Sequence, residues 1–364
     1  MRIVTVLTSL GVGGAEKQAL AVAERMAQRG HEVALVALMP RLAAEWPTTL
    51  PVAHLDIGKD PVSVVAGFLR ARRFLRAFRP DVVHSHSFHA NLLARLLRIG
   101  LPHFAVISTV HNVYEGGRLR MTAYRLTDRF TERTIAVSKA AAKRFVGLKA
   151  VPRRKCLVRA NGIDTAEFAP NAARRATTRA AMGADSNFVW LSAGRITPAK
   201  DYPNLLRAFE LVREQVSDVE LWIAGASTGA MVHAAEGGTQ NQVHWLGLRR
   251  DMPALLDAAD GFVLGSAWEG MPLVVGEAMA MEKLVVATDV GGVRELVGDE
   301  GGIVPAKDPQ KLAGSMLMVM RQSREDRAIA GRAARDRILR DFSIDAAADW
   351  WEMLYKQLIA NSEQ

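Results

Sequence analysis

Glu269 and Glu277 are separated by seven residues, in a segment that reads EGMPLVVGE and follows an expected strand. Pro272 suits the first position of a helix, where its missing N–H costs nothing. Gly270 and Met271 would then present backbone N–H groups at the positive end of that helix, which suits a phosphate or a charge developing on a sugar. The Glu277 carboxylate can accept two hydrogen bonds from a ribose diol, and Glu269 is free to approach a sugar. The alternative is a solvated loop glutamate followed by a glutamate on the helix surface.

A second segment, GRITPAKD, begins at Gly194 directly after another expected strand. Its two cations, Arg195 and Lys200, can neutralise a diphosphate leaving group, which gains charge as a glycosidic bond breaks. Gly194 permits a turn that brings Arg195 back over the edge of the sheet. The alternative is a solvated basic loop in which Asp201 caps the next helix.

A glycine loop, GVGGAE, follows the first expected strand. It does not match a dinucleotide-binding loop, because Glu16 replaces the final glycine and the second strand lacks a ribose-binding acid at its end. It does not match a P-loop either, because Lys17 is followed by Gln18. The remaining functional interpretation is that the backbone at Gly13 and Gly14 closely approaches a ligand. The alternative is a plain tight turn.

Four histidines lie near strand ends. His111 directly follows a strand, and we expect it to donate a hydrogen bond to a sugar hydroxyl. His84 and His86 point to one face of a strand, and His89 follows them. We interpret His84 as a packed or hydrogen-bonded histidine, and no third ligand with suitable spacing accompanies the His-x-His pair, so no metal site is predicted.

Length and composition indicate a globular chain with two domains. The chain has 364 residues, of which 49% are hydrophobic and 23% charged, and this length suits two α/β domains better than one core. The lone Cys156 cannot form an internal disulfide, which points to a reducing compartment. No apolar run approaches 18 residues, so a membrane-spanning helix is not expected. The apolar N-terminus stops at the glycine loop and is better interpreted as a buried strand than as a signal peptide.

Charge is distributed unevenly along the chain. Residues 1–170 hold 26 Lys and Arg against 12 Asp and Glu, a net charge of +14, whereas residues 171–364 hold 21 against 26, a net charge of −5. The basic half is suited to anionic lipid headgroups, nucleic acid or a phosphorylated substrate. Within it, apolar and basic residues interleave at helical spacing over residues 68–79. This pattern fits a helix on an anionic membrane, or equally a solvated basic face with Phe68, Leu75 and Phe78 in the core.

Strands and helices alternate through the chain twice, which predicts two parallel sheets. The expected strands are Ile3–Thr8, Glu32–Leu38, Val52–Ile57, Asp81–His86, Ala105–Val110, Thr134–Val137, Phe188–Ala193, Glu220–Ala224, Val243–Leu246, Gly261–Leu264, Leu284–Thr288 and Gly302–Val304. Open parallel sheets bind ligands beyond the carboxyl ends of their strands, and two facing sheets would place a ligand in the cleft between them.

The alternation pauses at residues 164–186, which are polar, rich in Ala, Arg and Thr, and expected to form a linker. Near the C-terminus Arg324–Leu339 is an expected helix with Ser323 as its N-cap. A last helix, Ile344–Ile359, carries Trp350 and Trp351, which suit docking on another surface.

Together these segments resemble family 4 of the retaining glycosyltransferases, over nearly the whole chain. The resemblance rests on Gly13-Gly14-Ala15-Glu16, His111, Asn161-Gly162-Ile163-Asp164, Gly194-Arg195 with Lys200, Glu269 to Glu277, and Gly291-Gly292. It implies an α/β architecture with the GT-B fold: two Rossmann-like, doubly wound parallel-sheet domains facing across a cleft. The first domain is expected at residues 1–165, on the acceptor side, with the helix at 344–364 packing back on it. The second domain is expected at residues 166–343 and binds the donor.

The resemblance also implies roles for individual residues. Arg195 and Lys200 bind the donor diphosphate, Glu269 approaches the transferred sugar, and Glu277 holds the ribose. His111 contacts the sugar near the reaction centre. The remaining expected donor contacts come from the glycine loop and the helix start: Gly13, Gly14, Gly270, Met271, Pro272 and Leu273.

Two departures from the family pattern concern selectivity. Lys200 is followed by Asp201 where many relatives have glycine, and the segment from Ile223 to Ser227 lacks a second glycine. Neither touches the charge chemistry.

The expected function is transfer of a hexose or N-acetylhexosamine, with retention, from a nucleoside-diphosphate sugar to a glycan or polyprenyl-diphosphate-linked acceptor in cell-surface polysaccharide or lipopolysaccharide biosynthesis. A UDP-sugar is the expected donor, and no cofactor is expected. We also expect a cytoplasmic protein at the inner face of the cell membrane, in contact with its anionic surface. A nucleotide-sugar epimerase is the alternative. A nucleic-acid-binding protein is disfavoured, because no recognisable reading module or interleaved exposed aromatics accompany the charge.

Retention is expected to follow a front-face route. A covalent double displacement needs a second carboxylate at the sugar, but ribose would occupy Glu277 and leave only Glu269. The departing phosphate oxygen would instead accept the acceptor's proton. No Asp-x-Asp occurs, with Asp218-Val-Glu220 the nearest, so a metal bridge to the diphosphate is not expected.

Overall fold

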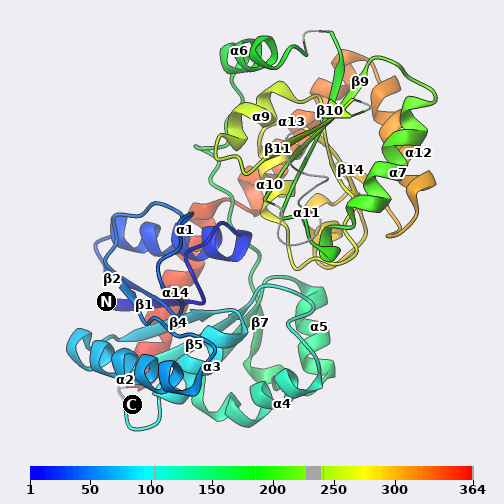
Figure 1. Cartoon of the computed structure of the whole chain (residues 1–364). Coiled ribbons are helices and arrows are strands. Elements are labelled where there is room, and N and C mark those ends of the chain that lie inside the picture. The colour runs from blue at the N-terminus through cyan, green and yellow to red at the C-terminus, as the bar shows by residue number, and fades with distance from the viewer. Residues whose placement is uncertain (102–103, 185, 227–238, 241, 363–364) are drawn as a thin grey trace. The chain divides into compact units, whose positions relative to one another are not determined.

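A computed structural model of the chain describes residues 1–101, 104–184, 186–226, 239–240 and 242–362 (Figure 1). Ser227, at which one of the sequence departures ends, and the last two residues of the expected helix at 344–364 lie outside these ranges. The chain divides into two compact units. Unit 1 comprises Met1–Gly162 and Ile344–Gln364, and unit 2 comprises Ile163–Ser343.

Unit 1 is built on a sheet of seven parallel strands in the order β3-β2-β1-β4-β5-β6-β7. The strands are β1 (Arg2–Leu7), β2 (Glu32–Ala37), β3 (Val52–His54), β4 (Val82–His86), β5 (Ala105–Val110), β6 (Arg133–Ala136) and β7 (Cys156–Val158). The helices are α1 (Gly14–Gln28), α2 (Pro61–Phe78), α3 (Phe88–Leu97), α4 (Arg118–Thr127), α5 (Lys139–Gly147) and α14 (Ile344–Ser362).

Both faces of this sheet are buried, as the continuous apolar runs of its strands require. In β1, Ile3 and Leu7 pack into one core with α1 and α14. Val4 and Val6 point the other way, into a core with α2 and α3. Because successive side chains of a strand alternate between the two faces, one short strand anchors helices on both sides.

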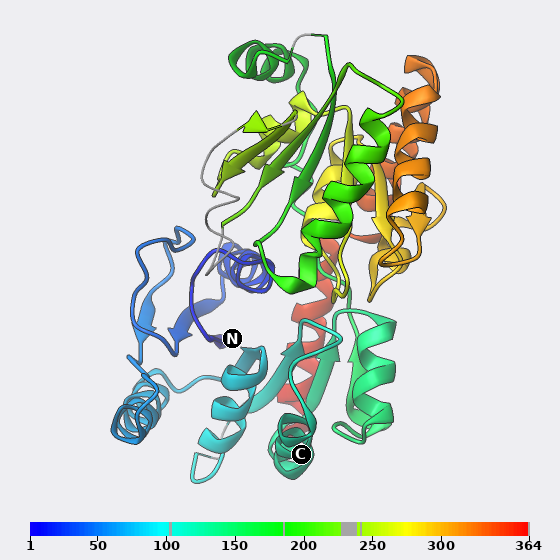
Figure 2. The same cartoon turned by 45° about the vertical axis from the view of Figure 1, so that its right-hand side comes forward.

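Helix α14 returns the C-terminal end of the chain to unit 1, where it lies among the N-terminal elements in Figures 1 and 2. Trp351 and Tyr355 are buried in the same core as α1. On the surface, Arg29, the C-cap residue of α1, forms ion pairs with Asp349, at 2.6 Å, and with Glu352, at 2.9 Å. Apolar packing and charge pairing therefore both hold α14 against α1.

Unit 2 has a second sheet with the order β10-β11-β9-β8-β12-β13-β14, in which only the edge pair β10–β11 is antiparallel. The strands are β8 (Phe188–Ala193), β9 (Val219–Ala224), β10 (Thr239–Gln240), β11 (Val243–Gly247), β12 (Gly261–Leu264), β13 (Leu284–Thr288) and β14 (Gly301–Val304). The described helices are α6 (Ala172–Met182), α7 (Tyr202–Arg213), α9 (Met252–Ala258), α10 (Leu273–Ala280), α11 (Val293–Val297), α12 (Pro309–Arg321) and α13 (Arg324–Asp341).

The segment 164–186, expected to form a linker, instead belongs to unit 2, and 11 of its residues form helix α6. The helix is polar, but its arginines are half-buried or buried and pair with acids of unit 2. Arg174 forms an ion pair with Asp257, and Arg179 with Asp260 at 3.0 Å. The polar residues of α6 therefore reflect charge pairing at a partly buried contact and not a linker between domains.

Two other local predictions have clear outcomes. The Ser323 side chain accepts a hydrogen bond from the Asp326 backbone N–H, which confirms the N-cap of α13. Leu75 is buried and Phe68 and Phe78 pack against the same core, as expected for the interpretation of residues 68–79 as a helix with an apolar core face.

Each sheet has one place where the chain reverses its direction of winding. In unit 1 this place lies between β1 and β4, and in unit 2 between β8 and β12. The loops that leave the carboxyl ends of such a strand pair diverge to opposite faces of the sheet, which opens a crevice for a ligand. A ligand site is therefore expected at the loops after β1, β4, β8 and β12.

Candidate active site

Lys200 and Glu269 meet at the winding reversal of unit 2. Lys200 ends the loop after β8, Glu269 lies in the loop after β12, and the Lys200 Nζ is 2.7 Å from Glu269 Oε1. Their side chains are 16% and 11% exposed, respectively. The hydroxyl of Ser266 donates a second hydrogen bond to the same carboxylate oxygen, at 2.7 Å. The carboxylate is thus held by a cation and a hydroxyl while it stays close to the surface.

The loop after β8 follows a path that needs glycine. Gly194 has φ +153°, and a Cβ added to Gly225 at the end of β9 would lie 1.9 Å from the Gly194 carbonyl oxygen. That carbonyl accepts a hydrogen bond from the Tyr202 hydroxyl at 2.8 Å. Two loops therefore pass each other without side chains between them, and the tyrosine fixes the turn that leads to Lys200.

Arg195 is placed differently from Lys200. It is exposed, and its side chain makes no hydrogen bond or ion pair with any residue in the described part of the chain. Asp201 occupies the N-cap position of α7 but has φ +45°, and its side chain makes no capping bond. The capping by Asp201 expected in the alternative is therefore wrong, while the exposed Arg195 is compatible both with binding of an anion and with a solvated basic loop.

The loop that carries Glu269 is braced by the glycines after β13. The Gly292 N–H donates to the Gly270 carbonyl at 2.7 Å. Gly291 has φ +58°, and a Cβ there would lie 2.1 Å from the carbonyl oxygen of Glu269. This close backbone contact explains why two glycines occur at this point of the sequence.

Pro272 is the N-cap residue of α10 and not its first helical residue, so that detail of the prediction is wrong by one position. Its ψ of 116° keeps it extended, and the helix starts at Leu273. Met271 and Leu273 are buried. The start of α10 thus lies where the sequence places it, but the proline ends the loop instead of opening the helix.

Glu277 lies one turn into α10 and is only 4% exposed, within a helix that is otherwise apolar or small. Glu269 is 9% exposed. The alternative of a solvated loop glutamate and a surface glutamate is therefore wrong for both. A carboxylate is buried at a cost unless it is paired or hydrogen-bonded, so both acids need partners from the fold or from a ligand.

In unit 1, the glycine loop after β1 forms the start of α1. Gly13 is the N-cap, with extended backbone, and Gly14 is the first helical residue. A Cβ at Gly13 would meet the Glu16 carboxylate. The N-terminus of α1, where backbone N–H groups have no partner within the helix, is thus covered on the Gly13 side by the Glu16 side chain.

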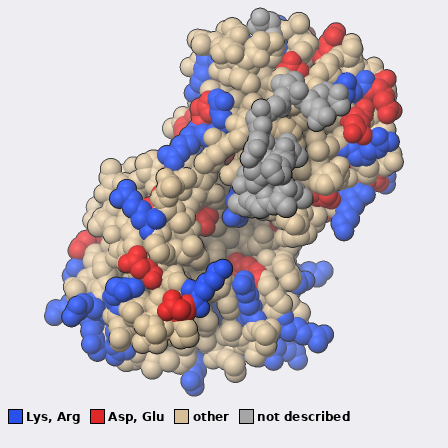
Figure 3. Space-filling model, viewed as in Figure 1, with Lys and Arg blue, Asp and Glu red and all other residues tan. Residues whose placement is uncertain are grey.

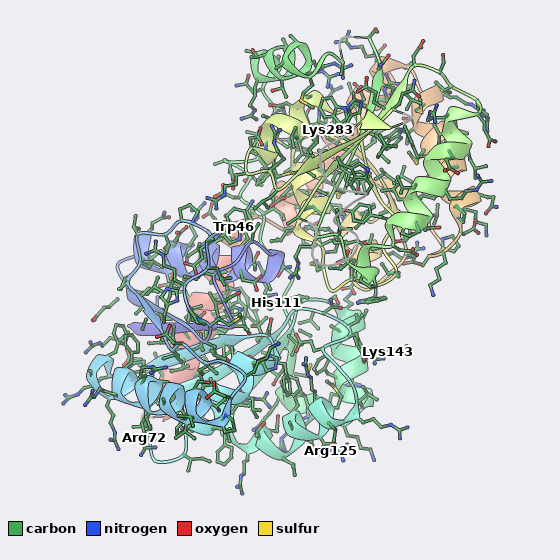
Figure 4. The ribbon with its side chains drawn as sticks, in the orientation of Figure 1. Trp46, Arg72, His111, Arg125, Lys143 and Lys283 are labelled. Carbon is green, nitrogen blue, oxygen red and sulfur yellow. The ribbon has the colours of Figure 1, made fainter. Side chains whose placement is uncertain are left out.

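His111, labelled in Figure 4, directly follows β5 and is half-buried. Its Nε2 lies 2.9 Å from Nδ1 of His86, at the end of the neighbouring strand β4. Burial lowers the pKa of His111 to about 4, so the ring is neutral near pH 7. A neutral imidazole can donate one hydrogen bond and accept one, which is compatible with the expected contact to a sugar hydroxyl.

Glu115 fixes the backbone of the His111 loop and was not expected from the sequence. Its carboxylate accepts hydrogen bonds from the His111 N–H at 3.0 Å and from the Tyr124 hydroxyl at 2.7 Å. Burial raises the pKa of Glu115 to about 7. No local pattern marks this residue, because its partners come from β5 and α4 and meet only in the fold.

His84 is a structural residue, as expected. It is buried, and its two ring nitrogens lie 2.7 Å from the Tyr355 hydroxyl and 2.7 Å from the Thr109 hydroxyl. Within the described residues, no group of three or more His, Cys, Asp or Glu side chains is arranged to hold a metal ion. In the same part of the chain, no helix combines the length and the apolarity needed to cross a membrane.

Lys283, also labelled in Figure 4, has a pKa lowered to about 8 by burial. It precedes β13 and donates to the Asp257 carbonyl at 3.3 Å. Its position at the amino end of a strand places it opposite the crevice, so it belongs to the packing of unit 2.

Comparisons with known proteins cover both units. A family profile described as "Glycosyltransferase Family 4" matches residues 12–167, and one described as "Glycosyl transferases group 1" matches residues 187–322. The UDP-Gal:alpha-D-GlcNAc-diphosphoundecaprenol alpha-1,3-galactosyltransferase of Escherichia coli is 26% identical over 85% of this chain and 82% of its own length.

Two further similarities agree with these matches. The N,N'-diacetylbacillosaminyl-diphospho-undecaprenol alpha-1,3-N-acetylgalactosaminyltransferase of Campylobacter jejuni is 23% identical over 83% of this chain and 84% of its own length. The crystal structure of Anabaena Alr3699/HepE in complex with UDP superposes with a TM-score of 0.83 at 20% identity, covering 98% of this chain and 100% of that one. The chain is therefore a glycosyltransferase that belongs to the group 1 and family 4 enzymes and has the GT-B fold.

Proposed function

We propose that this glycosyltransferase moves a hexose or N-acetylhexosamine from a UDP-sugar to a polyprenyl-diphosphate-linked or other glycan acceptor, with retention of the anomeric configuration. The observation that carries the proposal is the Lys200–Glu269 pair at the winding reversal of unit 2. It places a cation and an acid side by side at the carboxyl ends of two adjacent strands, which is where an α/β domain binds its ligand.

A diphosphate would compete with Glu269 for Lys200. Without a ligand, the 2.7 Å contact neutralises both side chains, which a partly enclosed site requires. A bound diphosphate offers Lys200 and the exposed Arg195 stronger charge-assisted partners. Glu269 would then keep its hydrogen bond from Ser266 and be free to bind a hydroxyl of the transferred sugar.

Glu277 has the surroundings of a ribose-binding acid. It is buried one turn into α10, close in sequence to the helix N-terminus at Pro272 and Leu273. Backbone N–H groups at that end attract phosphate oxygens, while the carboxylate can accept hydrogen bonds from both ribose hydroxyls. Gly270 and Met271 complete this proposed donor site in unit 2. In unit 1, we propose separately that Gly13, Gly14 and His111 contact substrate.

The proposed chemistry is a front-face displacement that needs no metal ion. The bond from the anomeric carbon to the diphosphate oxygen breaks, and the acceptor oxygen bonds to that carbon on the same face. The acceptor's proton passes to the departing phosphate oxygen. Arg195, Lys200 and the N-terminus of α10 stabilise the charge that develops there, which is the effect that contributes most in such sites.

The nature of the two substrates is inferred from relatives. The names of the E. coli and C. jejuni enzymes describe acceptors linked to undecaprenyl diphosphate, and the Anabaena structure contains UDP. We infer the same classes of donor and acceptor for this chain, and hence a role in assembling cell-surface polysaccharide or lipopolysaccharide. Nothing in these comparisons favours the epimerase alternative.

A lipid-linked acceptor requires contact with a membrane, and unit 1 has a suitable surface. Lys and Arg side chains are spread over unit 1 in Figure 3. On α2, Val62 is 77% and Leu69 is 58% exposed, and on α4, Leu119 is 88% and Leu126 is 69% exposed. Exposed apolar residues among arginines suit the interface of an anionic bilayer. We therefore propose a cytoplasmic, peripheral location at the inner face of the cell membrane, without a nucleic-acid partner.

The decisive experiment combines the purified protein with a panel of UDP-sugars and a synthetic polyprenyl-diphosphate-linked N-acetylglucosamine. We expect transfer from at least one donor, and NMR coupling constants should show that donor and product share one anomeric configuration. An inverted product would contradict the mechanism. Conversion of the donor in the absence of acceptor would favour the epimerase.

A flotation assay tests the membrane contact separately. The protein should float with vesicles that contain phosphatidylglycerol and be released as salt rises, because screening weakens surface charge pairing. Equal binding to neutral phosphatidylcholine vesicles would show that lipid charge is not recognised.

A further inference from the structure

Three histidine rings lie in a row at the carboxyl ends of β4 and β5. The ring centroids of His84 and His86 are 4.1 Å apart, and those of His86 and His111 are 5.2 Å apart. Only the second pair is joined by a hydrogen bond, between His86 Nδ1 and His111 Nε2 at 2.9 Å. The row therefore runs from the core to the half-buried His111, which the proposed function places at the sugar.

The two inner rings differ in how their nitrogens are used. Both nitrogens of His84 have hydroxyl partners, on Tyr355 and Thr109. His86 is only 3% exposed, and its Nε2 is buried without a partner among the described residues. His86 thus makes its one hydrogen bond to His111, while its other ring nitrogen has no partner among the described residues. Most buried polar side-chain atoms do have a partner.

This arrangement limits the tautomers that the pair can adopt. Burial lowers the pKa of both His86 and His111, so each neutral ring carries one N–H and one acceptor nitrogen. If His86 accepted the bond, its Nε2–H would be a buried donor with no acceptor. Native structures contain orphaned N–H groups less often than under-used acceptors. The pair is therefore best satisfied when His86 Nδ1–H donates to His111 Nε2.

The consequence reaches the surface of the site. With Nε2 acting as an acceptor, His111 must carry its proton on Nδ1, which has no partner in the described part of the chain. Neutral histidine in water prefers the other tautomer, with the proton on Nε2. The bond that one ring nitrogen makes decides which nitrogen carries the proton, so His86 reverses the intrinsic preference of His111.

We propose that His86 is a positioning residue for sugar transfer, which holds His111 in the Nδ1–H tautomer and so presents an N–H donor to a hydroxyl of the substrate sugar. This inference rests on the proposed function for the identity of the ligand, but the tautomer itself does not depend on it.

The tautomer is measured directly by long-range ¹H–¹⁵N correlation of the histidine rings in the purified wild-type protein. We expect His111, assigned by its loss in His111→Gln, to show a protonated Nδ1 and a bare Nε2. In His86→Leu the protons should return to the ordinary Nε2–H form. A wild-type His111 with its proton on Nε2 overturns the inference, whatever the protein's activity.

Kinetics test the consequence for catalysis. We expect His86→Leu to lower kcat roughly tenfold to hundredfold, the usual effect of losing one oriented hydrogen bond to a polar group, with unchanged affinity for free UDP. An Asn amide can stand where Nδ1 stands and donate to His111, so His86→Asn should recover most of the activity. The side-chain amide of His86→Gln would lie near the position of Nε2, so this variant should not recover the activity.

The comparison of Asn with Gln keeps the test valid if the leucine variant fails to fold. His54→Gln, a half-buried histidine on β3 that bonds the Met39 carbonyl, is the control and should leave kcat unchanged. Equal kcat for the wild type, His86→Asn and His86→Gln would overturn the role of His86. If the wild type transfers no sugar at all, the proposed function fails, while the NMR measurement still decides the tautomer.

Discussion

The Lys200 ammonium lies 2.7 Å from the Glu269 carboxylate, although 69 positions separate the two residues in the sequence. The pair joins the loops after β8 and β12, the adjacent strands between which the sheet of unit 2 reverses its winding. It links the two strongest sequence motifs into one feature whose charges are balanced before any ligand binds.

Removal of Lys200 should affect both stability and catalysis. In Lys200→Met the Glu269 carboxylate loses its cation in a largely enclosed site, so the free energy of unfolding should fall by about 3 kcal/mol. The specificity constant kcat/KM should fall roughly 10²–10³-fold, because charge on the leaving diphosphate is no longer stabilised. Urea unfolding and steady-state kinetics measure the two effects.

The double variant Lys200→Met with Glu269→Gln separates these effects. It removes both charges, so most of the stability should return while activity stays low. Additive stability losses in the double variant would show that the two residues do not interact.

Arg195→Ala should reduce activity with little effect on stability. The side chain is exposed and makes no hydrogen bond or ion pair within the described ranges, so its loss should change the free energy of unfolding by less than about 0.5 kcal/mol. If it binds the diphosphate, kcat/KM should fall roughly 10²–10³-fold. Arg207→Ala, on the exposed face of α7, is the matched control and should match the wild type; near-normal turnover in Arg195→Ala would remove Arg195 from the site.

Glu277→Gln should weaken nucleotide binding. Loss of the charge-assisted hydrogen bonds to ribose is expected to raise the Kd for UDP roughly tenfold to hundredfold, measured by calorimetry. Glu325→Gln, in the exposed first turn of α13, should leave the Kd unchanged. Equal Kd values for Glu277→Gln and the wild type would exclude Glu277 from the nucleotide site.

Two glycine substitutions should have opposite effects. Gly291 has φ +58° and faces the Glu269 carbonyl oxygen, so Gly291→Ala should destabilise the protein by more than about 1 kcal/mol and shift the Glu269 loop. Gly314 lies exposed within α12, and a Cβ there meets nothing within 4 Å. Gly314→Ala should therefore stabilise by roughly 0.5–1 kcal/mol. Thermal unfolding compares the two, and a Gly291→Ala protein as stable as the wild type would contradict the close contact.

The half-buried Glu115 predicts how stability depends on pH. Its pKa rises from 4.5 to about 7 on folding through burial, so between these values the folded chain keeps a proton that the unfolded chain has released. The free energy of unfolding should therefore fall as pH rises through this window and then level off. The charged and titratable groups that face Glu115 are those of Tyr124, Arg120, Arg95 and His111.

Glu115→Gln isolates this contribution, since the histidines and arginines are common to both proteins. Between pH 4.5 and pH 8 the wild type should lose about 3 kcal/mol more stability than the variant, measured by urea unfolding at each pH. Parallel pH profiles would show that the carboxylate ionises as easily in the fold as in water.

Much of this protein could be predicted from local sequence patterns. Runs such as Ala105–Val110, Phe188–Ala193 and Gly261–Leu264 are strands with the expected bounds, because apolar β-branched residues between helical segments have few other ways to be buried. The candidate motifs follow strands for the same reason. The charge difference between the halves is a property of composition alone. Where polarity was taken as a sign of a linker, at α6, the local pattern misled, since its arginines have acidic partners far along the chain.

Tertiary structure alone decided which of these segments are neighbours. Strand order brings β8 beside β12 and β4 beside β5, and only this pairing joins Lys200 to Glu269 and His86 to His111. The first division between the compact units comes after Gly162, where a boundary between residues 165 and 166 was expected, and the second comes before Ile344. Periodicity reports which face of an element is buried, but the partner on that face is chosen by packing between residues distant in sequence, which no local pattern records.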